Sequence, residues 1–176
     1  MLLDLRRAVT VSIIFFVMLG LAYPLVETGI GQALFNHQAN GSLTALGSTH
    51  IGQEWSGPQW FQGRADGYDP TATGGSNLGP RSKELLDKYK ERIASLEKQG
   101  LTPHQHLVSA SGSGVDPDIS PDAAYAQIPA VAKARGLSAD QLRTLVERHV
   151  QGPQYGFLGA SHVNVLELNK DLSTVK

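Results

Sequence analysis

The chain of 176 residues contains no cysteine, so it forms no disulfide and can build neither a thiolate nucleophile nor a zinc-thiolate site. A domain without such cross-links must be stable through its hydrophobic core. The chain also lacks an excess of either charge, since 15 basic and 16 acidic side chains give a net charge of −1. With no basic field to attract phosphates, the composition argues against a nucleic-acid partner.

Charge is missing altogether from residues 8–26, an apolar run that follows Arg6-Arg7. As a helix this run extends about 28 Å, close to the roughly 30 Å hydrocarbon core of a bilayer. No Lys or Arg follows until Arg64, so the positive-inside rule places the N-terminus in the cytoplasm and the rest outside. We therefore predict a single-pass protein of the plasma (inner) membrane with an extracytoplasmic domain. A cleaved signal peptide is the alternative, although its apolar region usually runs about 7 to 15 residues.

The predicted fold class is a single N-terminal transmembrane helix plus one mixed α+β extracytoplasmic domain. The small residues Ala8, Ser12 and Gly20 recur at multiples of four and predict a face that packs against partner helices. The predicted divisions are a cytoplasmic N-terminus (1–7), a transmembrane helix (8–30), a linker (31–48) and a soluble α+β domain (49–176).

Periodicity and capping signals predict the regular elements of the domain. Residues 82–99 have one apolar and one charged face, which is typical of an amphipathic helix. A second helix is expected over 120–136, bent or split at Pro129. A Ser-x-x-Gln capping box opens a third helix over 138–150, and the pattern of 163–168 predicts a strand.

A glycine-rich loop, Gly74–Pro80, precedes the first of these helices. Such loops at helix N-termini can cradle phosphates, which would indicate nucleotide binding. However, this loop lacks the spacing and the lysine of a P-loop, so a structural turn is favoured. In that interpretation Gly75 and Gly79 adopt backbone conformations that larger residues resist. The loop residues that would contact ATP or a partner are Gly75, Ser76, Asn77, Leu78 and Gly79.

A second loop, Ser109–Asp118, brings serines and carboxylates together, as in a nucleophile site or an oxygen-liganded cation site. Its Gly-Ser-Gly tripeptide does not fit G-x-S-x-G, and two carboxylates are too few for a calcium loop. Turn and cap chemistry is therefore favoured, and no metal site is predicted. A membrane-tethered extracytoplasmic serine hydrolase remains the alternative function. The residues of interest are Ser111, Gly112, Ser113, Gly114, Asp116 and Pro117.

Six blocks, in this order, carry a resemblance to a known family. They are the apolar anchor and then Ser48–Gln53, Trp60–Arg64, Gly74–Pro80, Ser109–Pro121 and Val163–Asn169. Together they resemble the C subunits of the Kdp-type potassium-transporting P-type ATPases of bacteria and archaea. The resemblance covers essentially the whole chain.

The resemblance implies a non-catalytic accessory subunit of a high-affinity, ATP-driven potassium uptake complex. The implied partners are the lipid bilayer, a potassium-translocating channel-like subunit, the P-type ATPase catalytic subunit and a small peptide subunit. No cofactor is expected to be tightly bound. ATP is implied by the resemblance only, because the family subunit is described as a catalytic chaperone that raises the ATP affinity of the pump subunit.

The block implicated in that chaperone role is Gly74–Pro80. The predicted topology puts this loop outside the cell, away from ATP. It favours a different role, in which the domain covers or gates the outer entrance of the channel-like subunit and stabilises the assembly.

Three positions depart from the family pattern. Ala65-Asp66 stands where Pro-Ser is common, His106 stands where an acidic residue is usual, and Asp118 replaces a frequent histidine. Roles that the resemblance implies for those side chains therefore do not transfer to this chain.

Overall fold

The computed structural model describes residues 1–175, and these divide into two compact units. The first unit is Met1–Leu43, and the second is the domain that begins at Thr44. Each unit is described by itself below.

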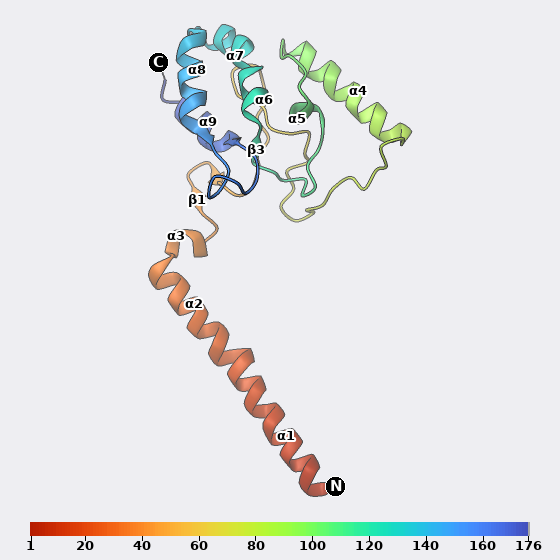
Figure 1. Ribbon diagram of the computed structural model, residues 1–176, viewed down its shortest axis with the longest axis vertical. Coiled ribbons are helices and arrows are strands. Elements are labelled where there is room, and N and C mark those ends of the chain that lie inside the picture. Colours follow the sequence, from red (N-terminus) through yellow and green to blue (C-terminus); the bar gives the residue numbers. More distant parts are fainter. Residues whose placement is uncertain (176) are drawn as a thin grey trace. The chain divides into compact units, whose positions relative to one another are not determined.

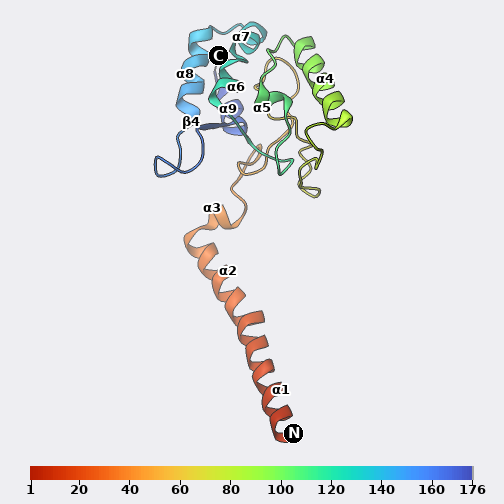
Figure 2. The same cartoon turned by 45° about the vertical axis from the view of Figure 1, so that its right-hand side comes forward.

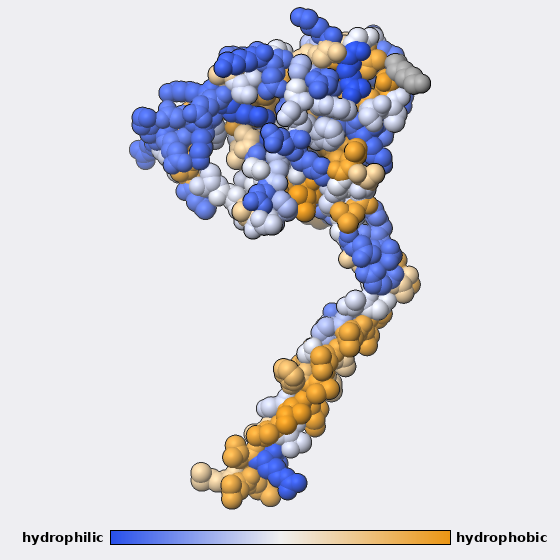
Figure 3. All heavy atoms as spheres, turned by 180° about the vertical axis from the view of Figure 1, so that it is seen from behind, coloured by the Kyte–Doolittle hydropathy of each residue, from blue (hydrophilic) through white to orange (hydrophobic). Residues whose placement is uncertain are grey.

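The first unit is one helix of 33 residues, Leu2–Leu34, which is long and apolar enough to cross a membrane. Figures 1 and 3 show this helix, which is hydrophobic over most of its length. At about 1.5 Å per residue it exceeds the thickness of a bilayer core, and the predicted span 8–30 lies within it. It consists of α1 (Leu2–Val17), the π-helical turn η1 (Met18–Ala22) and α2 (Tyr23–Leu34), followed by the short α3 (Asn36–Ala39).

The π-helical turn has a local cause in Pro24, which lacks a backbone N–H and would clash with the carbonyl four residues earlier. A wider turn relieves that clash, and the N–H of Tyr23 accordingly bonds to the carbonyl of Met18 five residues back. Gly20 lies inside this turn, whereas Ala8 and Ser12 lie on α1. All three are exposed on the isolated helix.

The second unit is a mixed helix and sheet domain, as expected. A small hairpin leads into it, and a three-stranded antiparallel sheet of order β3-β5-β4 lies among the C-terminal helices. Its elements are β1 (Leu43–Thr44), β2 (Gly47–Ser48), α4 (Lys83–Lys98), α5 (Gln105–Val108), β3 (Asp118–Ile119), α6 (Pro121–Tyr125), α7 (Ile128–Arg135), α8 (Ala139–His149), β4 (Val150–Gln151), β5 (His162–Asn164) and α9 (Val165–Leu172).

The hydrophobic core lies where α6, α7, α8 and α9 pack together beside β5. Val163 of the central strand pairs with Ile119 on one side and Val150 on the other, so the strand places a fully buried side chain at the centre of the sheet. The largest fully buried side chains of the core are Phe61, Leu96, Leu107, Ile119, Leu142, Leu166, Leu168 and Leu172.

The predicted helix boundaries follow local chemistry and are confirmed. The hydroxyl of Ser120 caps α6, and the split expected at Pro129 separates α6 from α7. The capping box of Ser138 and Gln141 is present at α8. Gly136 ends α7 at φ +70°, a left-handed conformation that favours glycine.

The strand predicted over 163–168 is wrong beyond Asn164. The side-chain oxygen of Asn164 accepts the N–H of Glu167 and starts helix α9, so the chain turns from strand to helix within one residue. Val165, Leu168 and Leu172 then share the buried face of that helix. The short apolar pattern after Val163 is compatible with a strand and with a helix, and the N-cap at Asn164 favours the helix.

Helix α4 has its predicted bounds, but less of its apolar face is buried than the sequence pattern predicts. Leu96 is fully buried near its end, whereas Leu86 is exposed. Figures 1 and 2 show α5 between α4 and α6, so the short helix α5 joins α4 to the rest of the domain.

Candidate functional site

The two glycine-rich loops cross in backbone contact. The N–H of Gly74 donates to the carbonyl of Ser113 at 2.7 Å. A β-carbon on Gly75 would lie 3.3 Å from the oxygen of Gly112, and one on Gly114 would lie 2.8 Å from the oxygen of Gly74. Gly114 also has φ +72°. The glycines are therefore needed where they meet one another, because no side chain fits between the two loops.

Asp66 fixes the second loop through three hydrogen bonds to its carboxylate. Its carboxylate accepts the backbone N–H and the hydroxyl of Ser111, both at 2.6 Å, and the N–H of Asp116 at 3.0 Å. The Ser111 hydroxyl oxygen in turn accepts the N–H of Gly114 at 2.9 Å. The loop is thus organised around one carboxylate, in the way an ionised acceptor orders several donors.

The guanidinium of Arg64 lies near Asp116 of the second loop, His106 and Ala110. Nη1 is 3.7 Å from Asp116 and 3.5 Å from Nδ1 of His106, and Nη2 donates to the carbonyl of Ala110 at 3.4 Å. Its Nε is buried without a hydrogen-bond partner among the described residues. Arg64 therefore joins α5 to the second loop but leaves one donor unused.

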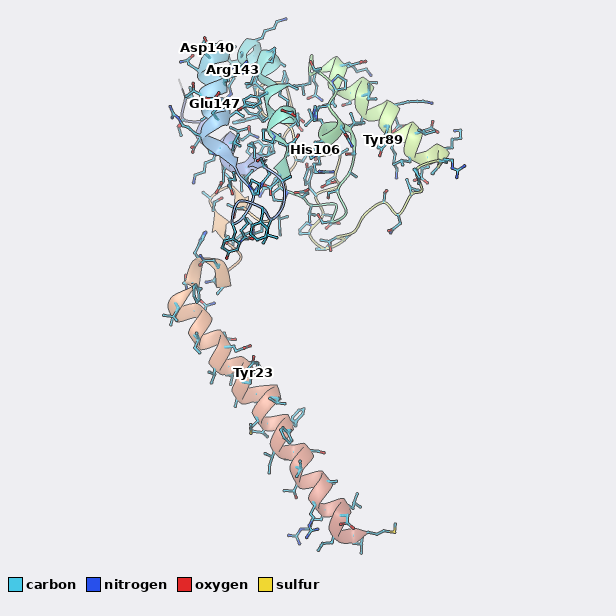
Figure 4. All side chains as sticks on the ribbon, viewed as in Figure 1. Tyr23, Tyr89, His106, Asp140, Arg143 and Glu147 are labelled. Carbon is cyan, nitrogen blue, oxygen red and sulfur yellow. The ribbon has the colours of Figure 1, made fainter. Side chains whose placement is uncertain are left out.

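His106 is held neutral in this cluster. Its Nδ1 also faces the N–H of Ser120 at 3.3 Å, and because both neighbours can only donate, Nδ1 acts as the acceptor. Burial lowers the pKa of His106, and the charge of Arg64 lowers it further. Figure 4 shows His106 in the part of the domain between α4 and the other helices.

A cavity of about 370 Å³ opens beside Arg64 and extends to α4. Its charged lining is balanced, because Arg64 and Arg92 face Glu54 and Asp66. Arg92 also donates to the carbonyl of Leu107 at 3.0 Å. Burial raises the pKa of the lining Tyr68 and lowers that of Arg92. This cavity is polar but offers no positive excess for a phosphate.

Two amides of the first loop already have hydrogen-bond acceptors, so they are not available to a phosphate. The N–H of Gly74 bonds to Ser113, and that of Leu78 faces the hydroxyl of Ser76 at 3.4 Å. Asn77 is exposed at φ +53°. The expectation that Gly75 and Gly79 need glycine conformations is wrong, since neither has a positive φ. A β-carbon on Gly79 would meet open space, whereas Gly75 is restricted only by its approach to Gly112.

The serines of the second loop have structural partners. Ser113 Oγ lies 3.2 Å from Ser111 Oγ and 3.3 Å from the N–H of Val115, and no histidine or lysine bonds to either serine among the described residues. The hydroxyl of Ser111 donates to Asp66, a carboxylate that also accepts two backbone N–H groups, so neither serine has the histidine or lysine base of a Ser-His or Ser-Lys pair. Within the same residues no group of three or more metal-ligating side chains is assembled. The carbonyl of Pro117 accepts the N–H of Val165, which ties this loop to α9.

Two of the three departures from the family pattern lie near Arg64. His106 faces the guanidinium of Arg64, and Asp66 accepts the N–H of Asp116, whose carboxylate is 3.7 Å from that guanidinium. Asp118 lies apart on β3, where Asn164 donates to it at 3.1 Å and His162 is 3.9 Å away. Burial raises the pKa of Asp118.

Sequence reasoning missed two buried amides that fix the Trp60–Arg64 segment. Asn169 of α9 accepts the N–H of Phe61 and donates to its carbonyl, both at 2.9 Å. Gln127 does the same for Gln62, at 2.7 and 3.1 Å. A polar residue on the apolar face of a helix, as Asn169 is between Leu168 and Leu172, was the available signal.

The chain is similar to known proteins over nearly its whole length. The family model for "KdpC: K+-transporting ATPase, c chain" matches residues 5–174. The potassium-transporting ATPase KdpC subunit of Geobacter sulfurreducens is 45% identical, with 98% of each chain covered. The KdpC subunit of Caulobacter vibrioides is 45% identical over 98% of this chain and 93% of its own length. That of Paraburkholderia phytofirmans is 44% identical over 97% and 96%.

Proposed function

The chain belongs to the KdpC family of K+-transporting ATPase c chains, and from that membership we propose how it serves its complex. Within a potassium uptake complex it is an accessory subunit that performs no catalysis. Its partners are a channel-like potassium-translocating subunit, the P-type ATPase catalytic subunit and a small peptide subunit. The apolar helix Leu2–Leu34 anchors it in the plasma (inner) membrane beside them.

The domain lies on the outer side of the membrane. The distribution of basic residues supports this orientation, because Arg6 and Arg7 precede the apolar run and no other Lys or Arg occurs before Arg64. On that side the domain covers or gates the outer entrance of the channel-like subunit and stabilises the assembly.

The observation that carries this role is the crossing of the two glycine-rich loops. The crossing brings the backbones of the two loops together, with a hydrogen bond from the N–H of Gly74 to Ser113, and so it fixes the shape of this part of the domain. The resemblance implies that the subunit raises the ATP affinity of the pump subunit. We assign that effect to the assembled complex and not to contact between the Gly74–Pro80 loop and ATP.

Orientation is tested with single cysteines, because the chain has none of its own. Lys90→Cys, on the exposed side of α4, should react with a membrane-impermeant maleimide in intact cells. Leu3→Cys, at the start of the helix, should react only after the cells are opened. The reverse pattern would place the domain inside the cell and end the proposal.

Nucleotide contact is tested with Asn77→Gly in the purified complex. This change removes the exposed amide but keeps the positive φ that Asn77 adopts. We expect the ATP dependence and the potassium dependence of ATPase activity to stay within about twofold of the unmodified complex. A selective rise in the ATP concentration needed for half-maximal activity, with assembly intact, would show that the loop contacts ATP.

A further inference from the structure

The loop between β4 and β5, residues 152–161, exposes three large hydrophobic side chains close together in sequence. Tyr155 is 81% exposed, Phe157 75% and Leu158 48%. Besides Leu43 and Leu46 of the β1-β2 hairpin, Leu86 is the other large hydrophobic side chain exposed in the described domain, and it has no such neighbour in sequence. Figure 2 shows the loop after β4 projecting away from the helices. Exposed apolar side chains that gather in one place mark interaction sites.

Hydrogen bonds hold this loop in the conformation that displays the rings. The N–H of Gln154 donates to the carbonyl of Leu158 at 2.8 Å, and the reverse bond is 2.9 Å. Gly156 donates to Pro153 at 3.0 Å. Tyr155 itself has φ +54°, which is uncommon for a bulky residue and occurs at binding sites more than elsewhere. The loop is therefore ordered before it meets a partner.

The chemistry of the loop indicates a protein surface rather than lipid headgroups. No residue from 150 to 161 is charged. Cores of protein interfaces are enriched in aromatic residues and depleted of charge. Anionic membrane surfaces instead attract Lys and Arg, which this segment lacks. The matching surface is accordingly apolar and uncharged.

The length of the intervening chain limits how far the base of this loop can lie from the membrane anchor. Gln151 and His162 line one cavity together with Thr49 and His50, and Asn164 donates to the carbonyl of Thr49 at 2.9 Å. Thr49 follows Leu34, the end of the apolar helix, by 15 residues, so a fully extended chain could carry it no more than about 50 Å away. A partner that shares the membrane is within that reach.

We infer that Tyr155, Phe157 and Leu158 dock into an apolar depression on the outer face of the channel-like subunit. This inference rests on the proposed function, because it takes the outer side and that partner from it. The rings anchor the domain, and the hydrogen-bonded turn presents them.

The test compares two single-cysteine variants, Phe157→Cys and, as a control of a solitary exposed apolar residue, Leu86→Cys. Each full-length chain is labelled with an impermeant maleimide in the assembled complex and, separately, alone in phosphatidylcholine vesicles. We expect Phe157→Cys to react at least tenfold more slowly in the complex than alone, and Leu86→Cys to react equally in both. Equal rates for Phe157→Cys would overturn the inference, and so would protection in vesicles without partners, which would indicate docking on lipid.

A second measurement separates docking from folding. Phe157→Ser with Leu158→Ser should lower the retention of the chain in the detergent-extracted complex severalfold, whereas Leu86→Ser should not. The unfolding midpoint of the isolated full-length chain should be the same for both. Retention unchanged by the double substitution contradicts the inference alone, while an unmodified chain that fails to co-purify with the other subunits contradicts the proposed function.

Discussion

Gly114→Ala probes the loop crossing most directly. The methyl group would have to adopt φ +72°, which costs about 1 to 2 kcal/mol for a residue with a β-carbon. It would also lie 2.8 Å from the oxygen of Gly74, so the two loops must move apart and lose the Gly74–Ser113 hydrogen bond, at about 1 kcal/mol more. We expect a loss of about 3 kcal/mol in the free energy of unfolding, or roughly 10 °C in the midpoint for a domain of this size.

The assay is denaturant unfolding of the full-length chain in mild detergent, followed by tryptophan fluorescence. Both tryptophans, Trp55 and Trp60, belong to the domain, so the anchor adds no signal. Gly136→Ala is the matched control, since Gly136 has φ +70° but open space where a β-carbon would lie. Its free energy of unfolding should fall by about 1 kcal/mol. Gly79→Ala, with neither constraint, should be neutral or slightly stabilising.

The difference between Gly114→Ala and Gly136→Ala isolates the crossing from the backbone conformation. If the two variants lose the same stability, the loops do not depend on their close approach, and the structural role assigned to the crossing is wrong. An equal loss in Gly79→Ala would show that the stability of the loop depends on something other than the geometry described.

Further predictions concern single side chains. Burial lowers the pKa of His106 below 6.5, so the unfolded chain binds more protons there, and stability should fall as the pH drops below about 6.5; His106→Gln should flatten that part of a pH series of unfolding midpoints. Arg135 donates to two carbonyls, at 2.9 and 3.0 Å, and lies 4.5 Å over Trp60, so Arg135→Lys should not restore the roughly 2 kcal/mol lost in Arg135→Ala, and equal stability of Lys and Arg would contradict this. Asn169→Leu should cost about 3 kcal/mol by the same assay, since it leaves a buried amide and carbonyl unpaired, and a loss under about 1 kcal/mol would refute the role of that side chain. Ser12→Leu with Gly20→Leu should weaken retention of the chain in the detergent-extracted complex, and full retention would exclude the proposed packing face.

Local signals predicted the local elements well. The capping box at Ser138 and the helix-ending Gly136 depend on neighbours a few residues away, and both were read correctly. The strand over 163–168 failed for a related reason, because a short alternating pattern fits a strand and a helix alike until the cap at Asn164 is considered. A single capping residue can therefore end a strand and begin a helix where the hydrophobic pattern alone would continue the strand.

Contacts between distant segments could not be read from the sequence. The sequence identifies both glycine-rich loops, but no pattern in either loop predicts that they contact each other. The sequence therefore pointed to Gly79, whereas Gly114 is the glycine that the contact between the loops requires. The hydrogen bonds of Asp66 to the second loop could not be predicted either, because Ser111 lies 45 residues away in sequence and no local pattern links the two residues. The family resemblance named the blocks without explaining their contacts.

The amide clamps on the Trp60–Arg64 segment also set the order in which the domain can form. Gln127 bonds Gln62 across 65 residues, but Asn169 must bond Phe61 across 108, so this segment has all of its partners only when the last helix is present. At about 5 to 20 residues per second, a ribosome takes about 5 to 20 seconds to make the intervening chain. The anchor therefore enters the membrane well before the domain closes. During that interval the aromatic segment is incompletely paired and open to a chaperone, and a chain cut short of Asn169 would lack the clamp on Phe61.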